Sequence, residues 1–108
     1  MDKHNQVPRE VLNKIQHAIC RADKLTFEYG QMQKRFTITP TDLTNRMTLI
    51  GVGTDGKVHF YYLNRMKNIE TIPNEKYEEG ECHWKEYPGD YRNPNERSFM
   101  PKFVEMFY

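Results

Sequence analysis

The sequence predicts an α+β domain in which one N-terminal helix is followed by five short antiparallel strands and an aromatic-rich C-terminal extension. An apolar stripe at helical spacing lies near the start, and apolar and polar residues alternate between residues 24 and 72. Aromatic residues gather after Pro73 without a sustained period. With 108 residues, the chain fits one domain built around a single core.

The helix is predicted to begin at Pro8, whose missing N–H has no intrahelical partner in a first turn. Lys14 and Arg21 fall outside the apolar stripe, so one face of the helix is expected to pack on the rest of the domain. The stripe is made of apolar residues three and four positions apart: Val11, Leu12, Ile15, Ala18, Ile19 and Ala22.

Five strands are predicted from period-two alternation and β-branched content. Pro40 is expected to end the second strand, because proline cannot donate to a central ladder. Gly53-Thr54-Asp55-Gly56 predicts a tight hairpin between the third and fourth strands. The predicted strands span residues 24–29, 35–39, 47–52, 58–63 and 66–72.

Short strands joined by tight turns favour a strongly bent sheet. Such a sheet usually closes into an SH3-like or Sm-like barrel, which removes exposed edges. The expected architecture is therefore a five-stranded barrel over residues 1–73, with the helix capping one open end.

Residues 74–108 form an extension of different character, which carries eight of the 14 aromatic residues. Disordered segments contain few aromatic residues. The extension is therefore expected to pack back on the barrel or to form a partner-binding surface. A short terminal helix is predicted between Glu96 and Phe107, with Pro101 in its first turn.

Charge and hydropathy narrow the class of protein. The net charge is +1, with 11 basic against 7 acidic residues through Pro73 and 5 against 8 afterwards. This asymmetry is too weak to predict nucleic-acid binding by itself. No apolar run is long enough for a membrane span and the start has no signal-peptide core, so a cytoplasmic protein is expected. Cys20 and Cys82 are expected to be free thiols.

No catalytic or metal-binding pattern is found. Cys82, His83 and His59 do not reproduce a common zinc spacing. The glycines of Gly51-x-Gly53-x-x-Gly56 imitate a dinucleotide fingerprint but lie in a predicted hairpin, whereas that fingerprint needs a strand-to-helix turn. We therefore expect no cofactor, no metal and no enzymatic activity.

The predicted body contains, in order, the stretches Ala18-Ile19, Leu25-Thr26-Phe27-Glu28-Tyr29, Arg35-Phe36-Thr37-Ile38-Thr39-Pro40-Thr41-Asp42-Leu43 and Tyr61-Tyr62-Leu63-Asn64-Arg65-Met66, followed by Ile69 and Ile72. In these stretches, about 60 residues of the chain resemble a WYL domain. The family's name-giving triplet falls on Met47-Thr48-Leu49, of which only the leucine is retained, and one expected arginine falls on His59.

The resemblance implies a positively charged pocket for nucleotide or nucleic-acid ligands, with Arg35 and Arg65 as its basic residues. His59 would partly replace the missing guanidinium, and Tyr61 on the same strand would offer a stacking surface. The structural alternatives are ion pairs of the arginines with Glu28, Asp42 or Glu70, and packing of the aromatic residues in the core or under the extension. Stand-alone WYL domains are associated with phages, mobile elements and bacterial defence, and such a setting is an expectation by analogy.

Two functional hypotheses follow. The first is a non-enzymatic regulatory module that binds a nucleotide or single-stranded nucleic acid through Arg35, Arg65 and neighbouring aromatic residues. The alternative is a protein-interaction module that uses the aromatic extension as its contact surface, with a homo-oligomer also possible. In the first hypothesis the acidic stretch Glu78-Glu79-Gly80-Glu81 would fold across the arginines and compete with the ligand.

Overall fold

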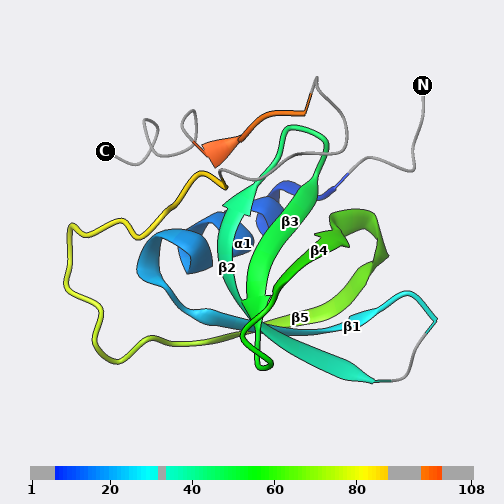
Figure 1. The fold of residues 1–108 in the computed structure, drawn as a ribbon, viewed down its shortest axis with the longest axis horizontal. Coiled ribbons are helices and arrows are strands. Elements are labelled where there is room, and N and C mark those ends of the chain that lie inside the picture. Colours follow the sequence, from blue (N-terminus) through cyan, green and yellow to red (C-terminus); the bar gives the residue numbers. More distant parts are fainter. Residues whose placement is uncertain (1–6, 32–33, 88–95, 101–108) are drawn as a thin grey trace.

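A computed structural model describes residues 7–31, 34–87 and 96–100. Within them, one helix precedes a five-stranded antiparallel sheet, so the predicted α+β class is confirmed (Figure 1). The elements are α1 (Arg9–Arg21), β1 (Lys24–Tyr29), β2 (Arg35–Leu43), β3 (Thr48–Gly53), β4 (Val58–Tyr62), the 3-10 helix η2 (Leu63–Arg65) and β5 (Met66–Ile72).

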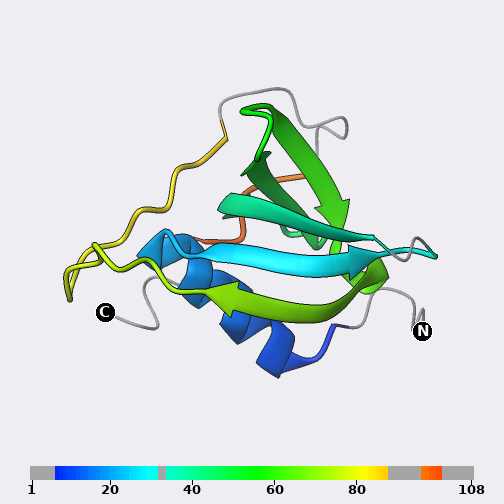
Figure 2. The same cartoon turned by 90° about the horizontal axis from the view of Figure 1, so that it is seen from below.

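The strands lie in the order β4-β3-β2-β1-β5, so four consecutive strands form a meander and β5 returns beside β1 (Figure 2). β4 and β5 are the two edges, and no ladder joins them among the described residues. The sheet is therefore open, whereas the sequence predicted closure. Near this opening, the Gly30 N–H after β1 donates to the Arg65 carbonyl before β5 at 2.9 Å, and the Tyr62 N–H of β4 donates to Tyr29 Oη of β1 at 3.1 Å.

The predicted apolar stripe is the buried face of α1, where Ile15, Ala18 and Ile19 have no exposed surface. Pro8 is the residue that caps the helix, which begins at Arg9. The helix ends at Arg21, and the following residue Ala22 caps it with a left-handed φ of 58°. The Asp23 N–H then donates to the Ala18 carbonyl at 2.9 Å, which satisfies a carbonyl left open at the helix end.

The prediction that Pro40 ends the second strand is wrong, since β2 continues to Leu43. A register shift between Pro40 and Asp42 marks a β-bulge, one of the few places where a sheet tolerates proline. The residue opposite Pro40 is Gly51. A Cβ at Gly51 would lie 3.2 Å from the Pro40 Cα and 2.8 Å from Ile38 Cδ1, so glycine permits this close approach.

The hairpin predicted at Gly53–Gly56 is confirmed. Gly56 has a φ of +79°, and the Gly53 N–H donates to the Lys57 carbonyl at 2.9 Å. The pattern Gly51-x-Gly53-x-x-Gly56 therefore lies at a strand-to-strand turn, as expected for a chance match to the dinucleotide fingerprint.

The sheet is covered on one face by α1 and partly covered on the other. On one face the paired residues Leu43 and Leu49 belong to the core cluster with α1, and their neighbour Tyr61 packs against it. On the other face the register places Asp42 beside Ile50 and Ile50 beside Phe60. Asp42 and Ile50 have no exposed surface, and Ile50 lies outside the core cluster. A second layer therefore covers part of this face.

That second layer is formed by the C-terminal extension. It leaves β5 beside the end of α1 and runs back along the sheet (Figures 1 and 2). The Lys85 N–H donates to the Thr41 carbonyl at 3.2 Å, and the Tyr87 ring meets the Phe60 ring edge-on at 5.6 Å. Residues 96–100 return to the end of β2, where Ser98 forms an isolated antiparallel β-bridge with Thr44, the residue after the strand. The part of the predicted terminal helix beyond Met100 lies outside the described residues.

None of the helices in the described ranges has the length and apolar character that a membrane span requires.

Candidate functional site

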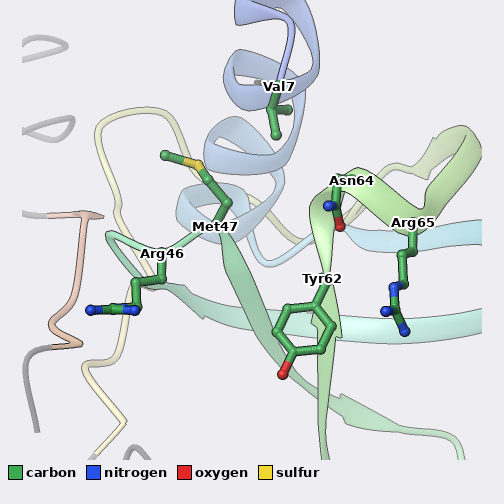
Figure 3. Close-up of a pocket in the computed structure, with 6 residues that line it drawn as sticks. All are labelled: Val7, Arg46, Met47, Tyr62, Asn64 and Arg65. Carbon is green, nitrogen blue, oxygen red and sulfur yellow. The ribbon is translucent and has the colours of Figure 1, made fainter. Parts of the chain in front are cut away.

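An open pocket of about 240 Å³ lies where the β2–β3 turn approaches the end of β4 (Figure 3). Two arginines flank the half-exposed ring of Tyr62, which comes from the edge strand β4. The lining residues are Val7, Arg46, Met47, Tyr62, Asn64 and Arg65. Basic and aromatic groups thus meet at a surface hollow.

The β2–β3 turn that carries Arg46 is fixed by a buried threonine. Thr44 Oγ1 accepts the N–H groups of Arg46 at 3.3 Å and of Thr48 at 3.2 Å, and the same hydroxyl bonds to Glu96. Met47 completes the turn with a left-handed φ of 60°. These local bonds hold the Arg46 backbone in place, so the start of its side chain has a defined position.

Arg65 is brought to the same place by η2. The Leu63 N–H donates to the Met47 carbonyl at 3.0 Å, which ties this short helix to the β2–β3 turn. The Arg65 Cζ lies 5.6 Å from the centre of the Tyr62 ring, within cation–π range. Figure 3 shows Arg65 running beside the ring and Arg46 extended away from it on the other side.

The guanidinium groups of Arg46 and Arg65 have no acidic partner in the described part of the chain. Among residues 7–31, 34–87 and 96–100, neither side chain forms an ion pair with an acidic group. Both residues are exposed. A surface pocket with two unpaired guanidinium groups attracts anions, and such groups present planar donor forks that match phosphate oxygens.

Arg35, the other arginine named from the sequence, does not line this pocket. It lies at the start of β2 and forms ion pairs with Glu28 at 3.5 Å and Glu70 at 3.8 Å. Its guanidinium also donates to the carbonyls of Thr26 at 3.0 Å and Asn68 at 2.7 Å. Glu28 and Glu70 are two of the three acidic partners that the sequence analysis named for a purely structural role of the arginines.

The partners of Arg35 surround an irregularity of the sheet. The β1–β5 register shifts between Thr26 and Glu28, and opposite this shift Asn68 has a left-handed φ of 51°. A bulge disturbs the ladder and leaves backbone groups without their regular partners. Arg35 donates to two of the carbonyls at this place, so its contacts are those of a residue that holds β1, β2 and β5 together.

His59 and Tyr61 also lie outside the pocket. His59 Nε2 is 3.0 Å from Asp55 Oδ2 at the base of the β3–β4 hairpin. The hydrogen bond from the Lys57 backbone N–H, followed by that from His59, holds the pKa of the Asp55 carboxyl below its ordinary value. The imidazole is therefore engaged within its own hairpin.

Tyr61 belongs to an aromatic cluster on the core face. Its ring meets those of Phe27 at 4.9 Å and Tyr29 at 5.0 Å, both edge-on, and that of Phe36 at 6.0 Å. Burial is the main cause that raises the pKa of the Tyr61 hydroxyl. Tyr61 thus packs in the core, while the alternation of β4 places Phe60 and Tyr62 on the exposed side.

The acidic stretch 78–81 does not lie across the pocket. Figures 1 and 2 place this part of the extension beside the end of α1, at the opposite end of the long axis from η2. Its neighbour Tyr77 lies under the Arg21 guanidinium, at 4.4 Å from ring centre to Cζ. Glu81 bonds to His83 at 3.0 Å. Competition of this stretch with a ligand at Arg65 is therefore not supported by its position.

Arg46 and the exposed position of Tyr62 are the parts of the pocket that the sequence did not predict. Arg46 follows the buried Thr44, and its nearness to Arg65 depends on the bond between Leu63 and Met47. The only sequence feature that could have pointed to Arg46 is its position as a basic residue in the turn between two predicted strands. Among the described residues, no group of three or more His, Cys, Asp or Glu side chains is placed to hold a metal ion.

Comparison of the chain with protein-family models, with curated proteins and with solved structures finds no match.

Proposed function

We propose that this chain is a non-enzymatic regulatory module that binds a nucleotide or single-stranded nucleic acid at Arg46, Tyr62 and Arg65. The observation that carries the proposal is a pair of arginines on either side of a half-exposed tyrosine ring, neither with an acidic partner among the residues that the structure describes. Phosphates would be held by the arginines and a base would stack on Tyr62.

The size of the pocket limits the size of the ligand that it can hold. A volume of about 240 Å³ is smaller than the roughly 300–1,000 Å³ typical of sites that enclose a small molecule. An open hollow of this size suits one nucleotide unit whose backbone continues along the surface. Stacking and backbone capture tolerate many sequences, so affinity would depend on salt more than on base identity.

We further propose that the chain is a divergent WYL-type domain with a barrel-like sheet. Two positions that carry the resemblance, Arg65 and the Met47 that replaces the first residue of the triplet, line the same pocket. β5 returns beside β1, and the Tyr62 N–H at the end of β4 donates to Tyr29 Oη at the end of β1, so both edge strands approach the end of β1, as a strongly bent small sheet requires. The regulatory role and a phage or defence setting follow from this analogy alone.

The test is direct titration of fluorescent RNA, single-stranded DNA and cyclic nucleotides, followed by anisotropy. The informative comparison is Arg65→Gln against Arg35→Gln, which remove the same charge from the same residue type. Loss of binding in Arg65→Gln with binding retained in Arg35→Gln supports the pocket. Equal loss in both variants, or no binding by the unmodified protein to any of these ligands, contradicts it.

A second candidate function is a protein-interaction module, which one observation favours. The edge strand β4 carries Val58, Phe60 and Tyr62 with 44%, 43% and 53% of their surface exposed. An edge strand with exposed apolar side chains can accept an added strand from a peptide. The sequence analysis assigned this role to the aromatic extension. In the structure, Trp84 and Tyr87 of the extension contact the sheet instead. Substitution of Phe60 by Lys would abolish peptide binding and leave binding of a cyclic nucleotide intact.

A further inference from the structure

The two cysteines of the chain, 62 positions apart, are brought together by the fold. Cys20 lies in the last turn of α1 and Cys82 lies in the extension, where the His83 N–H donates to the Cys20 carbonyl at 2.8 Å. Both are free thiols. Cys20 is 5% exposed, whereas Cys82 is open to solvent.

The two thiols also influence each other directly. Burial raises the pKa of the Cys20 thiol to about 12, and the hydrogen bond and charge of Cys82 contribute to the rise. The backbone bond from His83 to Cys20 places the residue next to Cys82 directly against Cys20, so the two cysteines are neighbours in the fold. The pair therefore combines one shielded thiol with one accessible thiol.

The segment that carries Cys82 is anchored on both sides. Before it, the Asn74 N–H donates to Asp23 Oδ1 at 2.6 Å and the Asn74 amide donates to the Arg21 carbonyl at 2.9 Å. After it, the Trp84 indole N–H donates to Asp42 Oδ1 at 2.9 Å. These anchors hold Cys82 beside Cys20 and raise the effective concentration of one thiol at the other.

We propose that Cys20 and Cys82 form an intramolecular disulfide when the protein meets a low-molecular-weight disulfide such as oxidised glutathione. The Cys82 thiolate attacks one sulfur of the oxidant, forms a mixed disulfide and releases one glutathione thiolate. The Cys20 sulfur then attacks the Cys82 sulfur, gives up its proton and displaces the second glutathione. Two protein thiols are oxidised and one glutathione disulfide is reduced to two thiols.

The surroundings of each cysteine assign its part in the exchange. Cys82 is exposed and is the sulfur that a dissolved oxidant can reach. Cys20 is shielded and protonated, so it does not react with the oxidant first and serves as the resolving thiol. The product ties the extension covalently to the end of α1 and closes a long loop that contains the whole sheet. This inference is independent of the proposed nucleotide pocket.

The experiment treats the full chain with oxidised glutathione, quenches with acid, alkylates in denaturant and measures intact mass. The expected product is a monomer that has lost both alkylatable thiols and carries no glutathionyl group. Cys20→Ala should stop at the mixed disulfide, with one glutathionyl group on Cys82. Cys82→Ser should take up no glutathione, and its Cys20 should remain alkylatable.

A wild-type protein that retains glutathione on Cys82, forms only disulfide-linked dimers, or keeps both thiols overturns the proposal. This result is read from the wild type, so it does not depend on the folding of either variant. Hydrogen exchange supplies a second measurement. Amides of residues 74–87 should exchange more slowly in the oxidised protein, and an unchanged rate there would contradict a bond that restrains the extension.

Discussion

The indole N–H of Trp84 donates a 2.9 Å hydrogen bond to Oδ1 of Asp42, a carboxylate with no exposed surface. The same oxygen accepts the Ser98 hydroxyl at 2.6 Å and the Leu43 N–H at 2.8 Å. A buried carboxylate is costly unless such donors satisfy it. Asp42 therefore joins β2 to two separate parts of the C-terminal extension.

Replacing Asp42 by Ala should destabilise the protein by about 3 kcal/mol or more, because one buried and two partly buried donors lose their acceptor. Urea unfolding followed by circular dichroism measures this change. Glu75→Ala, which removes an exposed carboxylate from the same extension, should change stability by less than about 0.5 kcal/mol. Similar values for the two variants would show that the Asp42 contacts do not hold the extension.

Arg46→Gln and Arg65→Gln should each weaken binding of a short oligonucleotide about tenfold, the effect of losing one charge-assisted hydrogen bond. For each lost phosphate contact, the slope of log affinity against log salt should fall in magnitude by about 0.7. Anisotropy titrations at several salt concentrations measure both quantities. Arg35→Gln is the matched control, and its salt slope should equal that of the unmodified protein.

The Asp55 carboxyl should titrate below its ordinary pKa of 3.8 in the folded protein. Because the folded-state pKa is depressed, its contribution to stability is present above the unfolded-state pKa and is lost as pH falls through the folded value. An NMR titration of the Asp55 side chain measures the midpoint. His59→Ala should recover only part of the shift, since the Lys57 N–H is its largest cause; full recovery would contradict this order of causes.

Ala22→Gly should stabilise the protein by roughly 0.5–1 kcal/mol, because a left-handed conformation strains alanine and not glycine. Thermal unfolding gives the sign directly. Ala18→Gly makes the same chemical change in the buried interior of α1, at a residue with no exposed surface. It should destabilise the protein, so opposite signs for the two variants are expected and equal signs would refute the explanation.

Local patterns predicted the elements well because each pattern is set by neighbours in the chain. The stripe that ends at Ala22 and the Asp55-Gly56 turn appear in the structure where the sequence placed them. Pro40 was misread because its place in β2 depends on a bulge and on Gly51 across the ladder. Neither feature is visible from the residues beside Pro40.

The site was harder to predict because it depends on contacts between distant segments. Arg65 does line a pocket, but its companion is Arg46 and not Arg35. Arg35 is engaged by Asn68 and Glu70, residues 33 and 35 positions later, which pairing of β5 with β1 brings near. The sequence stretches that resemble a WYL domain do not by themselves show which arginines form ion pairs in the fold.

The Asp42 contacts also impose an order on biosynthesis. Asp42 precedes Trp84 by 42 residues and Ser98 by 56, so a growing chain contains all five strands before the groups that cover Asp42 are made. Until then the carboxylate remains hydrated and the adjoining Ile50 lacks its cover. The nascent domain thus exposes Ile50, which the finished domain buries, and it is most vulnerable to association during that interval.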